Sequence, residues 1–352
     1  MRGRYLTIVS ALLFSLASQA GHAAQYITLD ISFDEGTALV GINSTNTGVG
    51  YSYDDRGQFH GFTFTPAGGY TGDIIVSHST IPAGIDDAGD VAGYYFDARN
   101  GTTPAHGFFV SSNGTVTKFD APGAGGGGAS TGTFVTKMNA GGVVTGFFTG
   151  EDSVNHGYVR TTDGTLTVFD APGAGGGASQ GTLPEAISDK GAICGRVTDA
   201  SGVLHAFIRK RHGAISTFDA PGAGTADRQG TVCVAIAGDG RTLGYMIDGS
   251  GALHGFLRAR DGTFTALDIP GASQASASLF AGRRLIGGFY DSNGTLHSFI
   301  YGPGGAIKQI DDPNAGTGSS QGTTVSGIGG GGVMVGSYVD SNLVSHGFIR
   351  MP

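Results

Sequence analysis

Residues 181–219, GTLPEAISDKGAICGRVTDASGVLHAFIRKRHGAISTFD, determine the fold class. Apolar runs occupy 182–187, 192–198, 205–208 and 214–218, and short polar turns rich in Asp, Ser and Gly separate them. Runs this short between such turns indicate β-strands, and no part of the sequence has sustained helical periodicity. The stretch therefore predicts an antiparallel meander of four strands.

The same pattern recurs along the chain, marked by His-Gly-Phe or a close variant in the third predicted strand. The histidines follow one another at intervals of 46, 50, 49, 49, 43 and 49 residues, at His60, His106, His156, His205, His254, His297 and His346. Four strands in a repeat of 40–50 residues are typical of a β-propeller blade. We therefore expect an all-β fold, a seven-bladed β-propeller with repeats of about 48 residues.

The two ends of the chain complement each other in this pattern. The last repeat stops at 346–352, without the final strand that ends in Phe-Asp, Leu-Asp or Ile-Asp in five other repeats. Residues 26–30, Tyr-Ile-Thr-Leu-Asp, supply such a strand before the first repeat begins. We therefore expect this N-terminal strand to complete the last blade and close the ring, which would leave no free sheet edge.

The repeat resembles the HAF-repeat family of predicted secreted bacterial proteins. The resemblance rests on His-Ala-Phe at 205–207 and on the consensus Ile-Asn/Asp…Gly-x-x-x-Gly-Tyr/Phe…Asp-x5-His-Gly/Ala-Phe…Phe-Asp-x-Pro-Gly-Ala. It covers essentially all of residues 25–352. It implies a secreted, β-propeller-like repeat protein, and it brings no catalytic or binding residues with it.

The first 24 residues are typical of a secretory signal peptide. Arg2 and Arg4 precede an apolar run at 6–16, and small residues follow at 17–24. The run is too short to span a membrane, which takes about 20 residues. The cleavage region contains no cysteine to which a lipid anchor could be attached. We expect a single propeller domain at 25–352, secreted or periplasmic in a bacterium, monomeric and without a membrane span.

The charge balance argues against nucleic acid as a partner. The chain has 352 residues, 66 of them glycine, and a net charge of −8. Loss of Arg2 and Arg4 with the leader leaves 18 basic and 28 acidic side chains, whereas nucleic-acid binders need a positive surface. Between Lys190 and Arg284 there are 11 basic and 7 acidic residues. This local excess fits either solvated hairpin tips or a docking patch for an acidic partner.

An aspartate accompanies each repeated histidine, usually six positions before it. These residues are Asp54, Asp97, Asp152, Asp199, Asp248, Asp291 and Asp340. An aspartate that opens a turn can accept hydrogen bonds from its own backbone, and a histidine can tie neighbouring loops together, so we expect structural roles. A metal needs three or four converging ligands, whereas third strands of separate blades lie apart. We therefore predict no cofactor and no metal site, with structural calcium at the turns as an alternative.

Two residues of the fourth repeat depart from the consensus. Glu185 is one of three glutamates, and Arg196 stands directly after Gly195, where other repeats carry an aromatic residue. The aromatic residues at that place are Tyr51, Tyr94, Phe147, Tyr245 and Phe289. Glu185 and Arg196 could form an ion pair that lines the central channel, bind an acidic or polar ligand, or act in acid–base catalysis. No catalytic motif accompanies them.

Cys194 and Cys233 are the two cysteines of the chain. An exported protein permits a disulfide, and their spacing fits no zinc pattern. The sequence allows either a disulfide between them or two separate buried thiols.

Glycine-rich loops at 122–128 and 172–177 follow the fourth predicted strands. They lack the Lys-Ser/Thr and the helix of a phosphate-binding loop, and they serve better as crossings to the next blade. Propeller geometry puts these crossings on the same face as the turns between second and third strands. We expect this face to bind a protein or a glycan as a scaffold. A carbohydrate-active lyase or hydrolase is the alternative, and enzymatic activity stays undecided because no catalytic signature is present.

Overall fold

The computed structural model describes residues 24–31, 34–98, 101–128 and 130–352. Within these residues the chain forms 28 β-strands and two short 3-10 turns, η1 (Pro303–Gly305) and η2 (Gly330–Gly332). The predicted all-β fold is confirmed. Among the described helical segments, none has the length and apolar character needed to cross a membrane. The signal peptide predicted at 1–24 lies, except for residue 24, outside the described residues.

Antiparallel pairings join the strands into consecutive groups of four. The first groups are β2 (Gly36–Ile42), β3 (Gly48–Tyr53), β4 (Phe59–Thr65) and β5 (Gly69–Ile74); β6 (Ser79–Ile85), β7 (Val91–Phe96), β8 (Ala105–Val110) and β9 (Val116–Phe119); and β10 (Gly132–Met138), β11 (Val144–Thr149), β12 (Asn155–Arg160) and β13 (Leu166–Phe169). The next are β14 (Gly181–Ile187), β15 (Ile193–Thr198), β16 (Leu204–Arg209) and β17 (Ile215–Phe218); β18 (Gly230–Ile236), β19 (Thr242–Ile247), β20 (Leu253–Arg258) and β21 (Phe264–Ala266); and β22 (Gln274–Ala281), β23 (Arg284–Tyr290), β24 (Leu296–Tyr301) and β25 (Ile307–Ile310).

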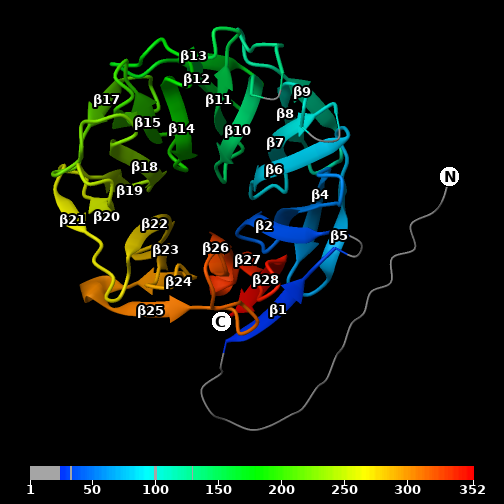
Figure 1. Ribbon diagram of the computed structural model, residues 1–352. Coiled ribbons are helices and arrows are strands. Elements are labelled where there is room, and N and C mark those ends of the chain that lie inside the picture. The colour runs from blue at the N-terminus through cyan, green and yellow to red at the C-terminus, as the bar shows by residue number, and fades with distance from the viewer. Residues whose placement is uncertain (1–23, 32–33, 99–100, 129) are drawn as a thin grey trace, which may run out of the picture.

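The remaining strands come from both ends of the chain. They are β26 (Gly322–Ile328), β27 (Met334–Val339), β28 (Ser345–Met351) and β1 (Gln25–Leu29). Strand β1 pairs antiparallel with β28, from Gln25 opposite Met351 to Leu29 opposite Gly347. Figure 1 shows β1 beside β28, with the groups arranged around a central opening and the first strand of each group nearest to it.

The repeated aromatic residue of the His-Gly-Phe motif forms the core between neighbouring groups. In the third strands these side chains are almost completely buried, at Phe62, Phe108, Tyr158, Phe207, Phe256, Phe299 and Phe348. Each sheet has a glycine in its second strand because a side chain there would collide with the first strand. A Cβ atom on Gly195 would lie 2.1 Å from the Leu183 carbonyl oxygen, and one on Gly146 would lie 2.0 Å from that of Phe134.

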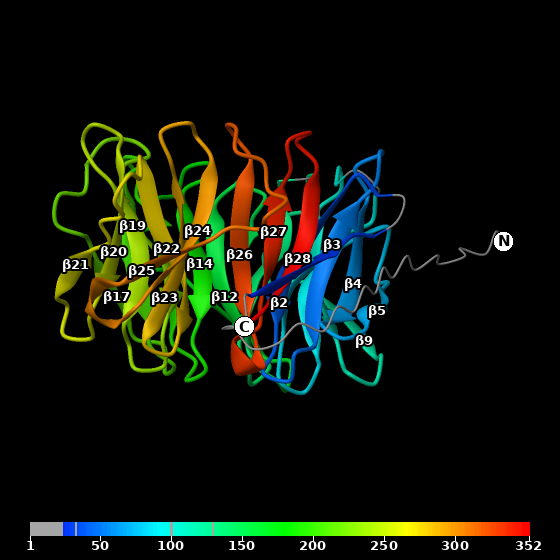
Figure 2. The same cartoon turned by 90° about the horizontal axis from the view of Figure 1, so that it is seen from below.

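Crossing loops and second-to-third turns meet on one face of the ring, which we call the crossing face. The loop before β14 is held where the Ala171 N–H donates to Thr182 Oγ1 at 2.9 Å. Gln180 Nε2 then donates to the Ala200 carbonyl in the turn between β15 and β16, at 3.2 Å. Figure 2, a view from the side, shows upright strands with loops gathered at both faces.

Cys194 and Cys233 form a disulfide between neighbouring groups. Cys194 lies in β15 and Cys233 in β18, their Cα atoms are 5.8 Å apart, and both side chains are buried. The bond therefore ties the second strand of one group to the first strand of the next.

Candidate functional site

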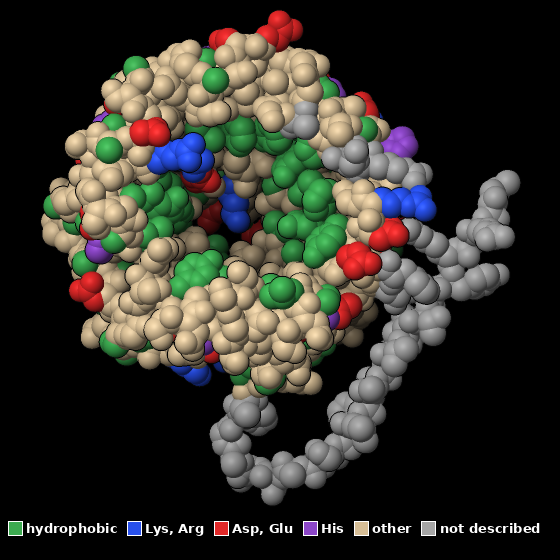
Figure 3. All heavy atoms as spheres, in the orientation of Figure 1, with side chains coloured by type: hydrophobic (Ala, Val, Ile, Leu, Met, Phe, Trp, Pro, Cys, Tyr) green, Lys and Arg blue, Asp and Glu red, His purple; other side chains and the backbone are tan. Residues whose placement is uncertain are grey.

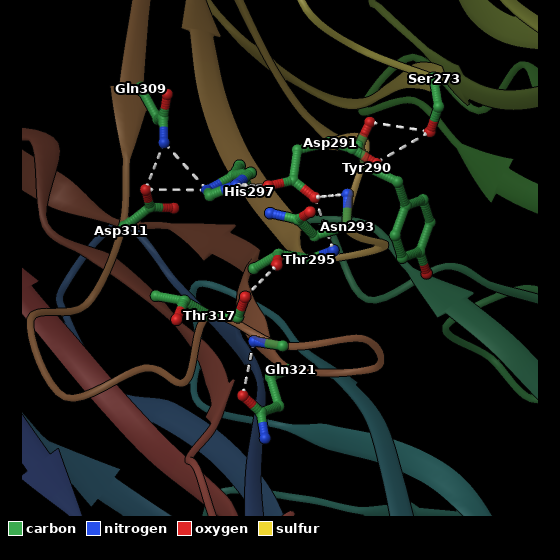
Figure 4. Close-up of polar contacts among 11 residues, drawn as sticks. Ser273, Tyr290, Asp291, Asn293, Thr295, His297, Gln309, Asp311, Thr317 and Gln321 are labelled. Atoms are coloured by element: carbon green, nitrogen blue, oxygen red, sulfur yellow. Dashed lines mark hydrogen bonds and ion pairs between the residues drawn. The ribbon is translucent and has the colours of Figure 1, made fainter.

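The repeated histidines hold third and fourth strands together at the outer edge. In five groups the histidine Nδ1 atom lies within 3.0 Å of a carboxylate that follows the fourth strand. We call these pairs the His–Asp belt: His106–Asp120, His156–Asp170, His205–Asp219, His297–Asp311 and His346–Asp30. Figure 4 shows one of them, where Gln309 Nε2 donates to the Asp311 carboxylate and lies 2.9 Å from His297 Nδ1.

The turn aspartates lie on the other side of several of these rings. The histidine Nε2 atom is 3.0 Å from the carboxylate in the pair of His254 and Asp248, and 3.5 to 3.8 Å in the pairs of His60 with Asp54, His106 with Asp97, His205 with Asp199, His297 with Asp291 and His346 with Asp340. Asp152 accepts from the Val154 N–H instead. Sequence reasoning found these acids but missed the belt carboxylates, although the recurrent Phe-Asp ending was a visible signal.

Apart from Asp97, whose carboxylate accepts from Ser77 Oγ, each turn aspartate also fixes its own hairpin. Asp291 Oδ1 accepts from the N–H groups of Asn293 and Thr295, at 2.8 and 2.9 Å. These backbone hydrogen bonds, the one from Thr295 above all, hold the pKa of Asp291 below its usual range. The turn aspartates therefore bond within their own repeats, and no group of three His, Cys, Asp or Glu side chains in the described part of the chain is arranged to hold a metal ion.

Aromatic side chains line one side of the central opening. Phe134 of β10 stacks on Phe147 of β11, with ring centroids 4.9 Å apart and planes 14° from parallel. Tyr94 of β7 meets Phe134 edge-on, at 5.4 Å and 64°. All three rings are half-buried. Among the described residues, Phe147 contacts no other aromatic ring, so one of its faces carries no ring partner there.

Glu185 and Arg196 form an ion pair beside this aromatic side. The pairing register of β14 with β15 shifts between Pro184 and Ala186, so Glu185 occupies a β-bulge. Its carboxylate accepts a hydrogen bond from Arg196 Nη1, and both side chains are about 30% exposed. Burial raises the pKa of Glu185, and the charge of Arg196 opposes that rise.

The register also corrects the sequence alignment in β23. Phe289 pairs with His297, as Val197 pairs with His205, so it does not stand in the place of Arg196. Gly288 does, because two glycines occur in succession and Gly287 is the one that packs against β22. Phe289 is buried instead, with its ring centroid 5.0 Å from that of His297.

The far side of the opening carries small residues at the places that register with Leu183, Glu185 and Arg196. They are Ser276, Ser278 and Gly288 in β22 and β23, and Thr324, Ser326 and Ser337 in β26 and β27. The lining of the opening therefore differs from group to group, whereas the outer edge repeats.

Two cavities occupy the opening. The larger, about 710 Å³, lies at the crossing face, and its lining includes Phe134, Phe147, Leu183, Arg196 and Tyr245. The smaller, about 480 Å³, is lined by Glu185 and by residues of the opposite turns. The ion pair therefore lies between the two. Figure 3 shows the hollow at the centre of the ring, with hydrophobic side chains around it and charged ones within it.

Charges around the larger cavity are paired. Arg196 is paired with Glu185, and at the rim Arg228 Nε lies 3.8 Å from the Asp227 carboxylate. Burial raises the pKa of Tyr245, with the charge of Arg196 acting against it. The Tyr245 hydroxyl has no hydrogen-bond partner among the residues that the structure describes. The cavity thus offers aromatic faces together with charged groups that are each paired with an opposite charge.

Comparisons with known proteins bear on the fold. No protein-family model and no curated protein matches the sequence. The structure is similar to the BP39L lectin from Burkholderia pseudomallei, with a TM-score of 0.54 and 14% identity over 91% of this chain and 99% of the lectin. The fold is β-propeller-like.

A second similar structure is the acylaminoacyl peptidase of Pyrococcus horikoshii. Its TM-score is 0.56 at 11% identity, over 90% of this chain and 52% of the peptidase, so the chain spans about half of that enzyme. At these identities the likenesses concern the fold alone.

Proposed function

We propose that this chain is an exported, seven-bladed β-propeller that acts as a binding scaffold through its crossing face, with a protein or a glycan as ligand. The observation that carries the proposal is the contrast between a repeated outer edge and a cavity of about 710 Å³ lined by residues that do not repeat. Small-ligand sites are concave, largely apolar and furnished with a few polar groups. A rigid repeated framework that presents variable residues suits selective binding.

The proposed closure of the ring rests on strand β1. Leu29 lies opposite Gly347 in the same relation as Phe218 opposite Ala206 within another group. Asp30 also lies 2.9 Å from His346 Nδ1, like Asp219 beside His205. These equivalences support β1 as the fourth strand of a seventh blade. The same proposal includes four further points. The leader directs export, the protein acts outside the cytoplasm, it is a monomer, and it is similar to HAF-repeat proteins.

The experiment is to screen residues 25–352, purified after export, on a glycan array and a protein array. We expect selective binding that Arg196→Ala weakens and that the exposed hairpin-tip change Arg211→Ala leaves unchanged. Binding that neither variant alters would place the interaction away from the crossing face. The lectin of similar fold favours including glycans in the first screen.

A carbohydrate-active lyase or hydrolase is the second candidate. It is favoured by Arg196 and Tyr245, which line the same cavity, because a lyase pairs a cation with a tyrosine or histidine base. Burial raises the pKa of Tyr245, which works against its use as a base near neutral pH. A zymogram panel on acidic polysaccharides separates the candidates, since clearing by the wild type but not by Tyr245→Phe would establish the enzyme.

A further inference from the structure

The wall of the larger cavity indicates the chemistry of its ligand, an inference that rests on the proposed function. Its volume of about 710 Å³ falls within the range of roughly 300–1,000 Å³ seen for small-ligand pockets. The cavity is therefore large enough for a ligand of a few rings, and its wall determines which kind of ligand fits.

The aromatic side of the wall favours a ligand with a flat apolar face. Phe147 is covered on one face by Phe134, at 4.9 Å, and no aromatic ring in the described ranges of the chain covers the other. Phe134 is in turn held by the edge of Tyr94. A ring supported in this way forms a fixed platform, so a ligand that stacks on it loses little binding energy to side-chain ordering.

The charged groups disfavour an anionic ligand. Arg196 is the cation that reaches both the cavity and the aromatic side, but it already bonds to Glu185. A ligand carboxylate would have to lie beside Glu185, where like charges repel. The second basic residue at this cavity, Arg228, is paired with Asp227 and is 91% exposed.

The same pair suits a ligand with hydroxyl groups. Arg196 donates one N–H group to Glu185, and among the residues that the structure describes its other guanidinium N–H groups have no hydrogen-bond partner. A hydroxyl both donates and accepts, so a sugar hydroxyl can accept from Arg196 at this cavity without breaking its bond to Glu185. The unpartnered hydroxyl of Tyr245 adds a third polar contact at the same cavity.

We propose that the cavity at the crossing face binds an uncharged saccharide, one sugar ring lying on Phe147 and its hydroxyls accepting from Arg196, the member of the ion pair that lines this cavity. A sugar ring combines an apolar C–H face with a rim of hydroxyls, and these match the two parts of the wall. Phe147 gives the stacking surface, and the Arg196–Glu185 pair selects uncharged rings over uronates.

The test is calorimetric titration of residues 25–352 with two sets of probes. One set contains neutral gluco-, galacto- and manno-oligosaccharides, and the other contains oligogalacturonate and alginate oligomers. We expect at least one neutral probe to bind, with Phe147→Ala and Arg196→Ala each raising Kd by about tenfold or more. Glu185→Gln keeps a hydrogen-bonding amide, so we expect a smaller loss.

Matched controls are Tyr290→Ala, an exposed aromatic residue on β23, and Arg211→Ala, both expected to leave Kd unchanged. Unfolding midpoints accompany every titration, and Phe147→Leu and Arg196→Lys replace any alanine variant that does not fold.

The outcomes are distinct. Tighter binding of a uronate than of every neutral probe, strengthened by Glu185→Gln, would overturn the proposal in favour of an anion site. Binding of a neutral probe with a Kd that neither Phe147→Ala nor Arg196→Ala changes would also overturn the proposal. If no saccharide binds at millimolar concentration but an arrayed protein does, the saccharide proposal is overturned and the proposal of a binding scaffold is retained. If nothing of either class binds, both fail.

Discussion

The outer edge and the central opening are built from the same four-stranded unit, yet they use its positions in opposite ways. At the outer edge, His156 and Asp170 repeat a contact found in four other groups. At the opening, Arg196 stands where other groups have tyrosine, phenylalanine, glycine or serine. Positions that every unit needs for folding remain alike, and positions that face the opening are free to differ. Stability should therefore depend on the repeated positions, and recognition on the varied ones.

The largest expected effect separates the two kinds of phenylalanine. Phe207 is fully buried between groups, so Phe207→Ala should lower the free energy of unfolding by about 3–5 kcal/mol. Phe134→Ala, at the opening, removes a half-buried ring and should cost about 1 kcal/mol. Denaturant unfolding measures both changes. Equal losses would remove the distinction between a structural core position and a variable position at the opening.

The disulfide comes next, because it joins one group to the next at a buried place. Replacing both Cys194 and Cys233 with alanine should lower the free energy of unfolding by about 2–4 kcal/mol, since 39 residues separate them. We expect saccharide or protein binding to persist under folding conditions. Loss of binding in a variant that still unfolds cooperatively would show that the bond shapes the opening as well.

The His–Asp belt should give a smaller effect. His156 lies 3.0 Å from Asp170 and stacks on Phe148 at 5.0 Å. His156→Ala should therefore cost about 1–2 kcal/mol of unfolding free energy, with ligand binding unchanged. The control is His212→Ala, an exposed hairpin-tip histidine, which should change stability by less than about 0.5 kcal/mol. A binding defect in His156→Ala alone would contradict the division of roles.

The smallest effect is the dependence of stability on pH, and its sign differs between the regions. Backbone hydrogen bonds lower the pKa of Asp291 and Asp340, so their stabilisation is complete above the unfolded pKa of about 3.9 and is lost as the pH falls through the lowered values. The pKa of Glu185 is raised by burial, so its contribution is present at low pH and is lost as the pH rises through the raised value.

Unfolding midpoints between pH 2 and pH 7 measure both signs. As the pH falls, the unfolding midpoint of Asp291→Asn should decrease less steeply than that of the wild type. The midpoint of Glu185→Gln should decrease slightly more steeply than that of the wild type. The same slope in both variants would contradict the pKa directions.

The sequence predicted much of the fold because the repeat is strict. Its strand-and-turn pattern gave the four-stranded unit, and the strand at 26–30 was expected opposite the last repeat, where β1 pairs with β28. The belt partner of each histidine was missed because His205 and Asp219 are 14 residues apart, and only the hairpin register of β16 and β17 brings them together.

The lining of the opening was harder to predict because it, too, depends on the register between neighbouring strands. Which side chains share its wall depends on the bulge at Glu185 and on the choice between two adjacent glycines in β23. A shift of one residue moves a side chain to the other face of a strand, which is how Phe289 was misplaced. The departures Glu185 and Arg196 could be found from sequence, but their direct contact and the aromatic side next to them could not.

The most direct measurement of the central claim is a crystal structure of residues 25–352 soaked with the neutral oligosaccharide that binds most tightly. We expect ligand density in the central opening at the crossing face, on Phe147 and within hydrogen-bond distance of Arg196. Density between neighbouring groups at the outer edge, against the His–Asp belt, would contradict it.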